Sequence, residues 1–409
     1  MLPVEQAEAI ILDLVNGFDS QRDVETLNLG ASLNRILATP VISQLDFPHW
    51  DNSAMDGYAV RFADVETTPT TLEIVEEIPA GYQPQNTLQP GQAARIFTGA
   101  IMPQGADTVI MQENTEKAEN NVKILQSPQS GEFVRHRASF YQAGTPLLSP
   151  GIPIKAAEMA VLAAAQCSEV TVYRQPRIAL FSTGDELVPV DQPLQPGQIV
   201  DSNQYALSAF IAQTGGIPLP LGIVRDREDK LRETIAYAIS TADVVLSTGG
   251  VSVGEYDLVG KILQELGGQV HVRTVAIKPG KPLTVATFNA NKTGRPCLYF
   301  GIPGNPVSAL VSCWRFVQPA LKKLSGLKAH WLPHFVTAKT AHPLKGAGKR
   351  DAYLWGQLTL KNEQYEFKLA GGSHSSGNLI NLAQTNGLAI VPTGTKEILA
   401  GEAVRVMQV

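Results

Sequence analysis

Short apolar runs alternate with helix-forming stretches through the middle of the chain. The apolar runs cover residues 178–181, 219–224, 244–246, 272–277 and 298–300, and the helix-forming stretches cover 203–213, 227–241 and 255–266. Short apolar runs that end at glycine-rich turns are typical of strands buried inside an α/β sheet. Strands that alternate with helices imply right-handed crossovers. The pattern therefore predicts an α/β domain with a mostly parallel sheet over residues 176–328.

The N-terminal part has a different pattern. Residues 4–17 place apolar side chains on one helical face, and residues 155–166 are again strong helix formers. Between them, residues 45–140 are rich in proline, glycine and threonine and contain only short strand-like runs. The pattern predicts a helical domain formed by residues 1–44 and 141–175, with a β-rich domain inserted at 45–140.

The last part of the chain, residues 329–409, is different again. It combines short alternating runs and glycine-rich turns with a final apolar run at 403–409. This combination predicts a small β-barrel. The chain as a whole is then a multidomain α/β protein with four domains.

Composition excludes some classes of protein. With 17% charged residues and a net charge of −5, the 409-residue chain lacks the basic surface of a nonspecific nucleic-acid binder. It has no apolar run of the ~18–20 residues that a membrane span needs, and residues 1–8 do not resemble a signal peptide. Cys167, Cys297 and Cys313 form no paired motif. We expect reduced thiols in a cytoplasmic protein.

Three glycine-centred loops follow predicted strands of the α/β domain, at Ser182–Glu186, Ser247–Gly254 and Gly301–Ser308. Parallel strands present such loops at one edge of the sheet, where backbone N–H groups bind anions. The second loop, with three glycines and three hydroxyls, is neither a Walker A loop nor a dinucleotide fingerprint. The loops predict a ligand that carries phosphate; taken singly, each also fits an ordinary turn with a helix cap.

Charged residues accompany these loops. Acidic side chains at Asp185, Glu186, Glu255 and Asp257 favour a hard cation beside the anion. Prolines stiffen the segment Ile277–Pro282, which carries two lysines and suits a second anion. The alternative for the two lysines is a solvated turn.

Two polar turns stand out in the β-rich domain. Asp51–Val60 contains two carboxylates, an amide and a hydroxyl within six residues, and Arg95–Ala100 is a second turn. Spacing alone does not distinguish either segment from a structural turn. His374 is interpreted as a hydrogen-bonded surface residue rather than a metal ligand.

These blocks, in this order, resemble the MoeA family, the molybdopterin molybdenumtransferases, to which the plant Cnx and animal gephyrin E domains are related. The resemblance runs from residue 3 to 409 and includes the domain order. It implies a cytoplasmic homodimer in which a MogA-like, three-layer α/β domain holds molybdopterin. The active cleft would lie between the α/β domain of one subunit and the β-rich domain of the other.

The resemblance also implies a reaction. Molybdate is joined to adenylylated molybdopterin with Mg²⁺ as cofactor, and AMP and molybdenum cofactor are released. A MogA-like protein and apo-molybdoenzymes are the implied protein partners, with neither nucleic acid nor a membrane involved.

Site residues are carried over from the family position by position. The catalytic residues are Asp56, Thr98, Asp226 and Asp257, and the metal ligands are Asp185, Glu186 and Asp257. The substrate-binding residues are Ser182, Thr183, Asp185, Glu186, Gly249, Gly250, Ser252, Lys278, Lys281, Pro303, Asn305, Ser308, Arg350 and Ser373.

Two segments depart from the family pattern. Near the end of the inserted domain, Ala138 replaces a glycine and Phe140 replaces an aspartate; in the C-terminal domain, Trp355 replaces an arginine. Phenylalanine can neither bind Mg²⁺ nor accept a hydrogen bond. The departures leave two alternatives open beside the insertase: a non-catalytic carrier of molybdopterin or cofactor, and a MogA-type molybdopterin adenylyltransferase.

Overall fold

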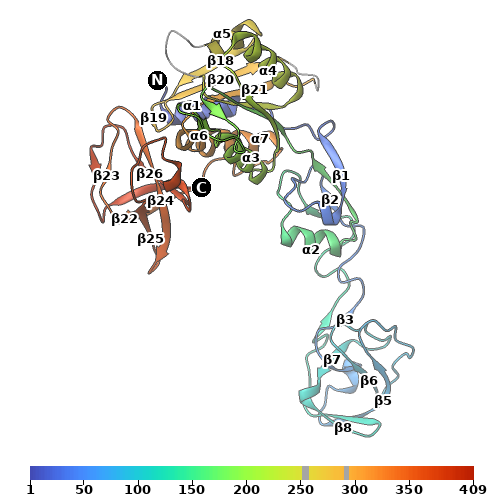
Figure 1. The fold of residues 1–409 in the computed structure, drawn as a ribbon. Helices are drawn as coiled ribbons and strands as arrows, with labels where there is room; N and C mark the ends of the chain where they lie inside the picture. Colours follow the sequence, from blue (N-terminus) through green and yellow to red (C-terminus); the bar gives the residue numbers. More distant parts are fainter. Residues whose placement is uncertain (251–257, 290–293) are drawn as a thin grey trace. The chain divides into compact units, whose positions relative to one another are not determined.

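The computed structural model describes residues 1–250, 258–289 and 294–409. The chain divides into two compact units, which are described separately below (Figure 1). The larger unit comprises Met1–Thr39, Pro150–Ala157 and Glu169–Val409, and the smaller comprises Pro40–Ser149 and Glu158–Ser168. The boundaries of the four predicted domains stay predictions.

A six-stranded sheet forms the centre of the larger unit. Its strands lie in the order β16-β13-β17-β21-β20-β18. The first four are parallel to one another, β20 pairs antiparallel with β21, and β18 pairs antiparallel with β20. Their bounds are β13 Arg177–Thr183, β16 Ile217–Val224, β17 Val244–Thr248, β18 Gln269–Thr274, β20 Pro282–Phe288 and β21 Cys297–Ile302. The mostly parallel sheet is confirmed. Strand β20 was not predicted, because its threonines break the apolar run and it directly follows the lysine–proline segment.

Helices cover both faces of this sheet. Successive strand residues point to opposite faces, so Ile178 and Leu180 join one core with α3, α6 and α7, while Ala179 and Phe181 join another core with α4 and α5. The helices are α3 Asn203–Gln213, α4 Glu228–Thr241, α5 Leu258–Glu265, α6 Pro306–Ser312 and α7 Gln318–Leu324, with a π-helical turn at Cys313–Val317. Two separate cores on the two faces of one sheet confirm the three-layer arrangement.

The N-terminal helix α1 (Val4–Leu14) belongs to the larger unit and is three residues shorter than expected. Its buried residues Val4, Ala7 and Ile11 share the core with α7. Strand β1 (Val24–Asn28) then pairs antiparallel with β12 (Glu169–Tyr173). The described cysteines are free, as expected, and burial raises the pKa of the Cys297 and Cys313 thiols.

A closed barrel forms the C-terminal part. Strand β24 pairs with both β25 and β26, which closes the circle β24-β25-β22-β28-β26 and confirms the predicted barrel. The strands are β22 Phe335–Thr340, β24 Asp351–Lys361, β25 Gln364–Leu369, β26 Gly387–Val391 and β28 Ala403–Gln408. The short strand β19 (Ile277–Lys278) pairs with the start of β24. Smaller elements of this unit are β14 Leu187–Val188, β15 Ile199–Val200, β23 Leu344–Lys345, β27 Glu397–Ile398 and the 3₁₀ turns Leu29–Ala31 and Leu379–Leu382.

The smaller unit is built on a second six-stranded sheet, in the order β7-β4-β6-β5-β9-β8. These strands are β4 Gly57–Val60, β5 Thr70–Ile78, β6 Gln92–Ile96, β7 Thr108–Met111, β8 Thr115–Ala118 and β9 Asn121–Ile124. Other elements are β2 Val41–Ile42, β3 Asn52–Ser53, β10 Val134–Arg135, β11 Pro146–Leu148 and the 3₁₀ turns Phe62–Asp64 and Gln112–Asn114. The helix α2 (Ala156–Ala164) belongs to this unit from its third residue onward. Tyr58 and Val60 face one core and Ala59 faces another, so this sheet too is covered on both sides.

Among the described residues, no helix has both the length and the apolar character that a membrane crossing requires.

Candidate functional site

The carboxyl ends of three parallel strands meet at one edge of the larger sheet. Thr248, at the end of β17, donates its hydroxyl to Ser182 Oγ at the end of β13 (3.1 Å). The next residue, Gly249, donates its backbone N–H to the carbonyl of Ile302 at the end of β21 (3.3 Å). The three glycine-centred loops therefore begin side by side, as the sequence predicts.

The loops approach each other at backbone level. Gly249 and Gly250 have φ angles of +83° and +63°, and a Cβ atom on Gly304 would lie 3.4 Å from the Cα of Gly249. Asn203, the first residue of α3, donates its side-chain N–H to the carbonyl of Gly304 (2.7 Å). The helix start and two loops are thus tied into one wall.

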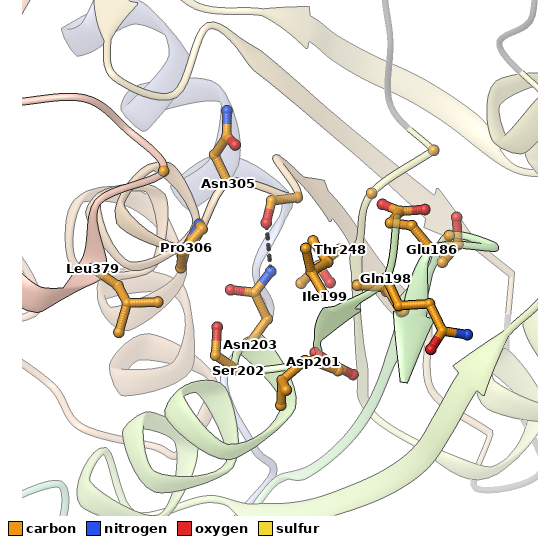
Figure 2. Close-up of a pocket in the computed structure, with 18 of the residues that line it drawn as sticks. Glu186, Gln198, Ile199, Asp201, Ser202, Asn203, Thr248, Asn305, Pro306 and Leu379 are labelled. Atoms are coloured by element: carbon orange, nitrogen blue, oxygen red, sulfur yellow. Dashed lines mark hydrogen bonds between the residues drawn. The ribbon is translucent and has the colours of Figure 1, made fainter. Parts of the chain in front are cut away.

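These loops surround a cavity of about 740 Å³ (Figure 2). In the close-up, Pro306 and Leu379 lie on one side and Glu186 and Gln198 on the other. Asp201 and Ser202, which directly precede α3, lie between them. The described lining residues are Thr183, Gly184, Glu186, Leu187, Leu194, Gln198, Ile199, Val200, Asp201, Ser202, Asn203, Asp226, Thr248, Gly249, Gly250, Gly304, Asn305, Pro306, Gly377 and Leu379.

The cavity brings six of the predicted site residues together: Thr183, Glu186, Asp226, Gly249, Gly250 and Asn305. Ser182, Pro303 and Ser308 are buried beside these loops and do not line it. Ser252 and Asp257 lie outside the described residues.

Acidic side chains lie at one end of the cavity. Asp226 accepts a hydrogen bond from the Thr183 hydroxyl (2.7 Å), and Arg225 donates to the carbonyl of Asp185 (2.7 Å). Asp185 and Glu186 are exposed. Within the described ranges no three His, Cys, Asp or Glu side chains form a group that could hold a metal ion, so the metal site stays a prediction.

Four further predicted residues, Lys278, Lys281, Arg350 and Ser373, do not line this cavity. The pairing of β19 with β24 nevertheless places Lys278 opposite Ala352, two residues after Arg350. The proline-stiffened lysines and Arg350 therefore lie at the junction between the α/β part and the barrel.

A barrel loop also contacts the cavity wall, which the sequence did not indicate. Ser376 accepts two hydrogen bonds, its carbonyl from the Val307 N–H and its hydroxyl from the Asn305 side chain, each 3.2 Å long. Gly377 and Leu379 follow and line the cavity. The loop thus joins the barrel to the start of α6.

A second polar site lies in the smaller unit. Asp56 Oδ1 accepts hydrogen bonds from both the backbone N–H and the hydroxyl of Thr98 (2.7 and 2.8 Å). These two bonds, from the backbone first, hold the pKa of the exposed Asp56 carboxyl below its usual value, and the positive charge of Arg95 adds to the effect. The two predicted residues are in direct contact, and Asp56 is a carboxylate at neutral pH.

Three family models match the chain. They describe the MoeA N-terminal region (domain I and II) over residues 2–165, a probable molybdopterin binding domain over 179–323, and the MoeA C-terminal region (domain IV) over 337–409. A molybdopterin molybdenumtransferase from Nostoc sp. is 58% identical over 100% of this chain and 94% of its own length. The chain belongs to the MoeA family.

Other MoeA proteins agree with this assignment. A molybdopterin molybdenumtransferase from Haemophilus influenzae is 34% identical over 99% of this chain and 98% of that protein. A solved structure described as a molybdopterin biosynthesis MoeA protein from Pyrococcus horikoshii matches with a TM-score of 0.82 at 29% identity, covering 100% of this chain and 99% of that one. The order of elements seen here is therefore that of a MoeA fold along the whole chain.

The two departures from the MoeA pattern have different surroundings. Trp355 is buried, with 1% of its surface exposed, and its ring centroid lies 4.5 Å from that of His374. His374 is hydrogen-bonded as expected, through Nε2 and the carbonyl of Ala370, but it is half-buried. Phe140 is 62% exposed and packs beside Phe47. Trp355 therefore has a packing role, whereas the exposed face of Phe140 has none within its unit.

Replacing Thr98 by valine should raise the pKa of Asp56 towards its usual value. Valine has the same shape but removes the hydroxyl bond and leaves the backbone bond in place. Because the two bonds keep Asp56 ionised to a pH below its usual pKa, the variant should become protonated at a higher pH than the wild type. ¹³C NMR titration of Asp56 measures the shift. Thr98→Ser keeps a hydroxyl and should titrate like the wild type; coincident curves for the valine variant would contradict the assignment.

Replacing Gly249 by alanine should destabilise the protein by more than the same change at Gly222. Both glycines have φ near +84°, where alanine costs about 1–2 kcal/mol. A Cβ on Gly249 would also lie 2.4 Å from the carbonyl oxygen of Thr183, whereas a Cβ on Gly222 meets nothing within 4 Å. We expect the first variant to lose about 1–3 kcal/mol more from overpacking. Urea unfolding measures the difference, and equal losses would mean that the loop relaxes freely.

Proposed function

We propose that this chain is a molybdopterin molybdenumtransferase that inserts molybdate into adenylylated molybdopterin and releases AMP. The observation that carries the proposal is the cavity at the carboxyl edge of the sheet, which is lined by glycine-rich loops. Backbone N–H groups in glycine loops at positive φ bind phosphate without a charged side chain. Gly249 and Gly250 have the positive φ angles of such a loop, although the N–H of Gly249 is bonded to the carbonyl of Ile302.

Three cationic residues are proposed to bind molybdate. Lys278, Lys281 and Arg350 are brought near the β19–β24 junction. Hydrogen bonds between such side chains and an oxyanion are about twice as strong as neutral ones. The dianion would be held there while the molybdopterin phosphate lies in the glycine loops.

Mg²⁺ is the proposed cofactor. Asp185, Glu186 and Asp257 would hold it, since Mg²⁺ binds proteins through one or two carboxylates and completes its coordination with water and substrate phosphate. The exposed carboxylates of Asp185 and Glu186 fit this donor set. The bound ion would neutralise charge on the departing AMP.

One assay tests the proposed function. Purified protein is incubated with adenylylated molybdopterin, molybdate and Mg²⁺, and AMP release and reconstitution of an apo-molybdoenzyme are measured. We expect both. Binding without turnover would make the protein a carrier, the alternative raised by Phe140 and Trp355. Transfer of AMP from ATP to molybdopterin, in a parallel incubation with those two substrates, would make it an adenylyltransferase.

We expect a homodimer in solution. Asp56 and Thr98 lie in one compact unit and the glycine loops in the other, and the family resemblance joins them across subunits. Sedimentation equilibrium at micromolar concentration should give twice the chain mass of 44.0 kDa. A single species of monomer mass would contradict the shared cleft. A MogA-like protein and apo-molybdoenzymes are the further partners that we propose.

A further inference from the structure

Asp201 is a buried carboxylate whose surroundings account for only one of its oxygens. It lies between β15 and α3, and 4% of its surface is exposed. Its Oδ1 accepts the backbone N–H of Gln204 in the first turn of α3 (3.2 Å). Its Oδ2 is buried and has no hydrogen-bond partner within residues 1–250, 258–289 and 294–409.

Capping of helix α3 accounts for the hydrogen bond to Oδ1, but it leaves Oδ2 without a role. A side-chain oxygen before a helix accepts one N–H group of the first turn, and asparagine or serine would serve as well. A buried acceptor without a donor costs about 1–3 kcal/mol, and more when it is charged. The second oxygen therefore calls for a donor that the described residues do not supply.

Asp201 lines the large cavity, and no lysine or arginine is among the described lining residues. Arg225 lines a smaller adjoining hollow with Asp201, but its described hydrogen bond is to the carbonyl of Asp185. With no donor among the described residues, Oδ2 can accept one from a ligand or a water molecule.

Aliphatic side chains form the walls next to this carboxylate. Leu187, Leu194 and Ile199 come from the segment before α3, and Leu379 comes from the barrel loop (Figure 2). Leu194, Ile199 and Leu379 are 56%, 54% and 45% exposed. Apolar walls with a few placed polar groups are typical of small-molecule sites, in which the polar groups fix the orientation of the ligand.

We propose that Asp201 recognises the pterin ring of the substrate through the ring's 2-amino and N3–H groups. These two parallel donors form a guanidine-like edge, which a carboxylate accepts in a bidentate manner. The aliphatic walls then cover the ring faces, and the phosphate extends to the glycine loops. This assignment rests on the proposed function, and it names the residue that selects a pterin over other flat rings.

The Asp201→Asn variant tests the assignment. Asparagine keeps the size of the side chain and the capping oxygen for Gln204, and it replaces the free acceptor by an N–H donor. That N–H donor would face the 2-amino donor of pterin, with which it cannot form a hydrogen bond. It would instead suit lumazine, in which a carbonyl replaces the 2-amino group.

Binding of pterin and lumazine to the full chain is measured by saturation-transfer NMR titration. In the wild type we expect pterin to bind about tenfold or more tightly than lumazine, the scale of one hydrogen bond to a charged group. In D201N we expect pterin to lose at least that factor and the preference to reverse. The matched control is Asp191→Asn, an exposed carboxylate in the same segment that does not line the cavity.

Three results would overturn the inference: equal pterin affinity for wild type and D201N, no preference for pterin in the wild type, or the same loss in D191N. The first is the result expected if a water molecule satisfies Oδ2. Thermal unfolding shows that the variants are folded. The proposed function fails separately, when the wild type releases no AMP in the insertion assay, whichever pteridine it prefers.

Discussion

The Asp56→Asn variant should lose about 10²–10⁴-fold in the rate of AMP release, the range typical of removing a general acid or base. Both Thr98 bonds go to one oxygen, Oδ1, which the amide of asparagine retains. The substitution therefore removes the charge and the second acceptor while the turn keeps its hydrogen bonds. We expect the fold and the melting temperature to change little.

The rate is measured in single turnovers with adenylylated molybdopterin, molybdate and Mg²⁺. The matched control is Glu116→Gln, which neutralises an exposed carboxylate of the same unit, paired with Lys123 at 3.5 Å. The control should turn over at the wild-type rate. If Asp56→Asn also releases AMP at the wild-type rate, Asp56 only stabilises its turn, and another residue is the acid or base of the reaction.

The Asp243→Ala variant should lose about 3–5 kcal/mol of unfolding free energy, because it leaves a partly buried guanidinium without its main partner. Both oxygens of Asp243 accept hydrogen bonds from Arg174, at 2.7 and 2.8 Å, and one also accepts the backbone N–H of Arg177 (2.9 Å). The Asp243 side chain is 4% exposed and that of Arg174 is 24% exposed. Burial opposes the charge of Arg174, but the hydrogen bonds and negative charges of Asp243 and Asp23 together outweigh it and hold the pKa of Arg174 above its usual value.

Asp229→Ala is the matched control for this prediction. Asp229 also accepts two hydrogen bonds from one arginine, Arg227, at 3.1 and 3.0 Å, but on the surface. Exposed pairs contribute about 0–1 kcal/mol, so the control should unfold near the wild-type urea concentration. Equal losses in the two variants would mean that Arg174 finds a new partner or water in the absence of Asp243.

The sequence predicted most readily those elements whose apolar residues form a continuous run or a helical repeat. Strands β13, β17 and β21 are buried throughout, so each appears as a continuous apolar run followed by a glycine loop. Helix α3 was predicted at its observed bounds. Strand β20 alternates apolar residues with threonine, and β1 and β12 are short and partly exposed, so their patterns resemble those of loops.

The sequence predicted some residues of the candidate site and missed others. Loop residues such as Gly249 stood out because they break a strand, and Asp56 and Thr98 stood out as members of polar turns. Their mutual contact, across 42 positions of sequence, is visible only in three dimensions. Asp201 was missed because a carboxylate before a helix is the ordinary signal of a cap, and Leu379 because an apolar residue in a turn carries no chemistry of its own.

The hydrogen bonds of Ser376 couple the barrel to the occupancy of the cavity. Because Leu379 lines the cavity and Ser376 fastens the same loop to Asn305 and Val307, a ligand that favours the fastened loop is itself bound more tightly by it. The ligand stabilises the fastened loop by the same free energy by which the fastened loop strengthens ligand binding. A bound pterin should therefore slow proteolytic cleavage between residues 371 and 382, and loosening of the barrel should speed the release of product.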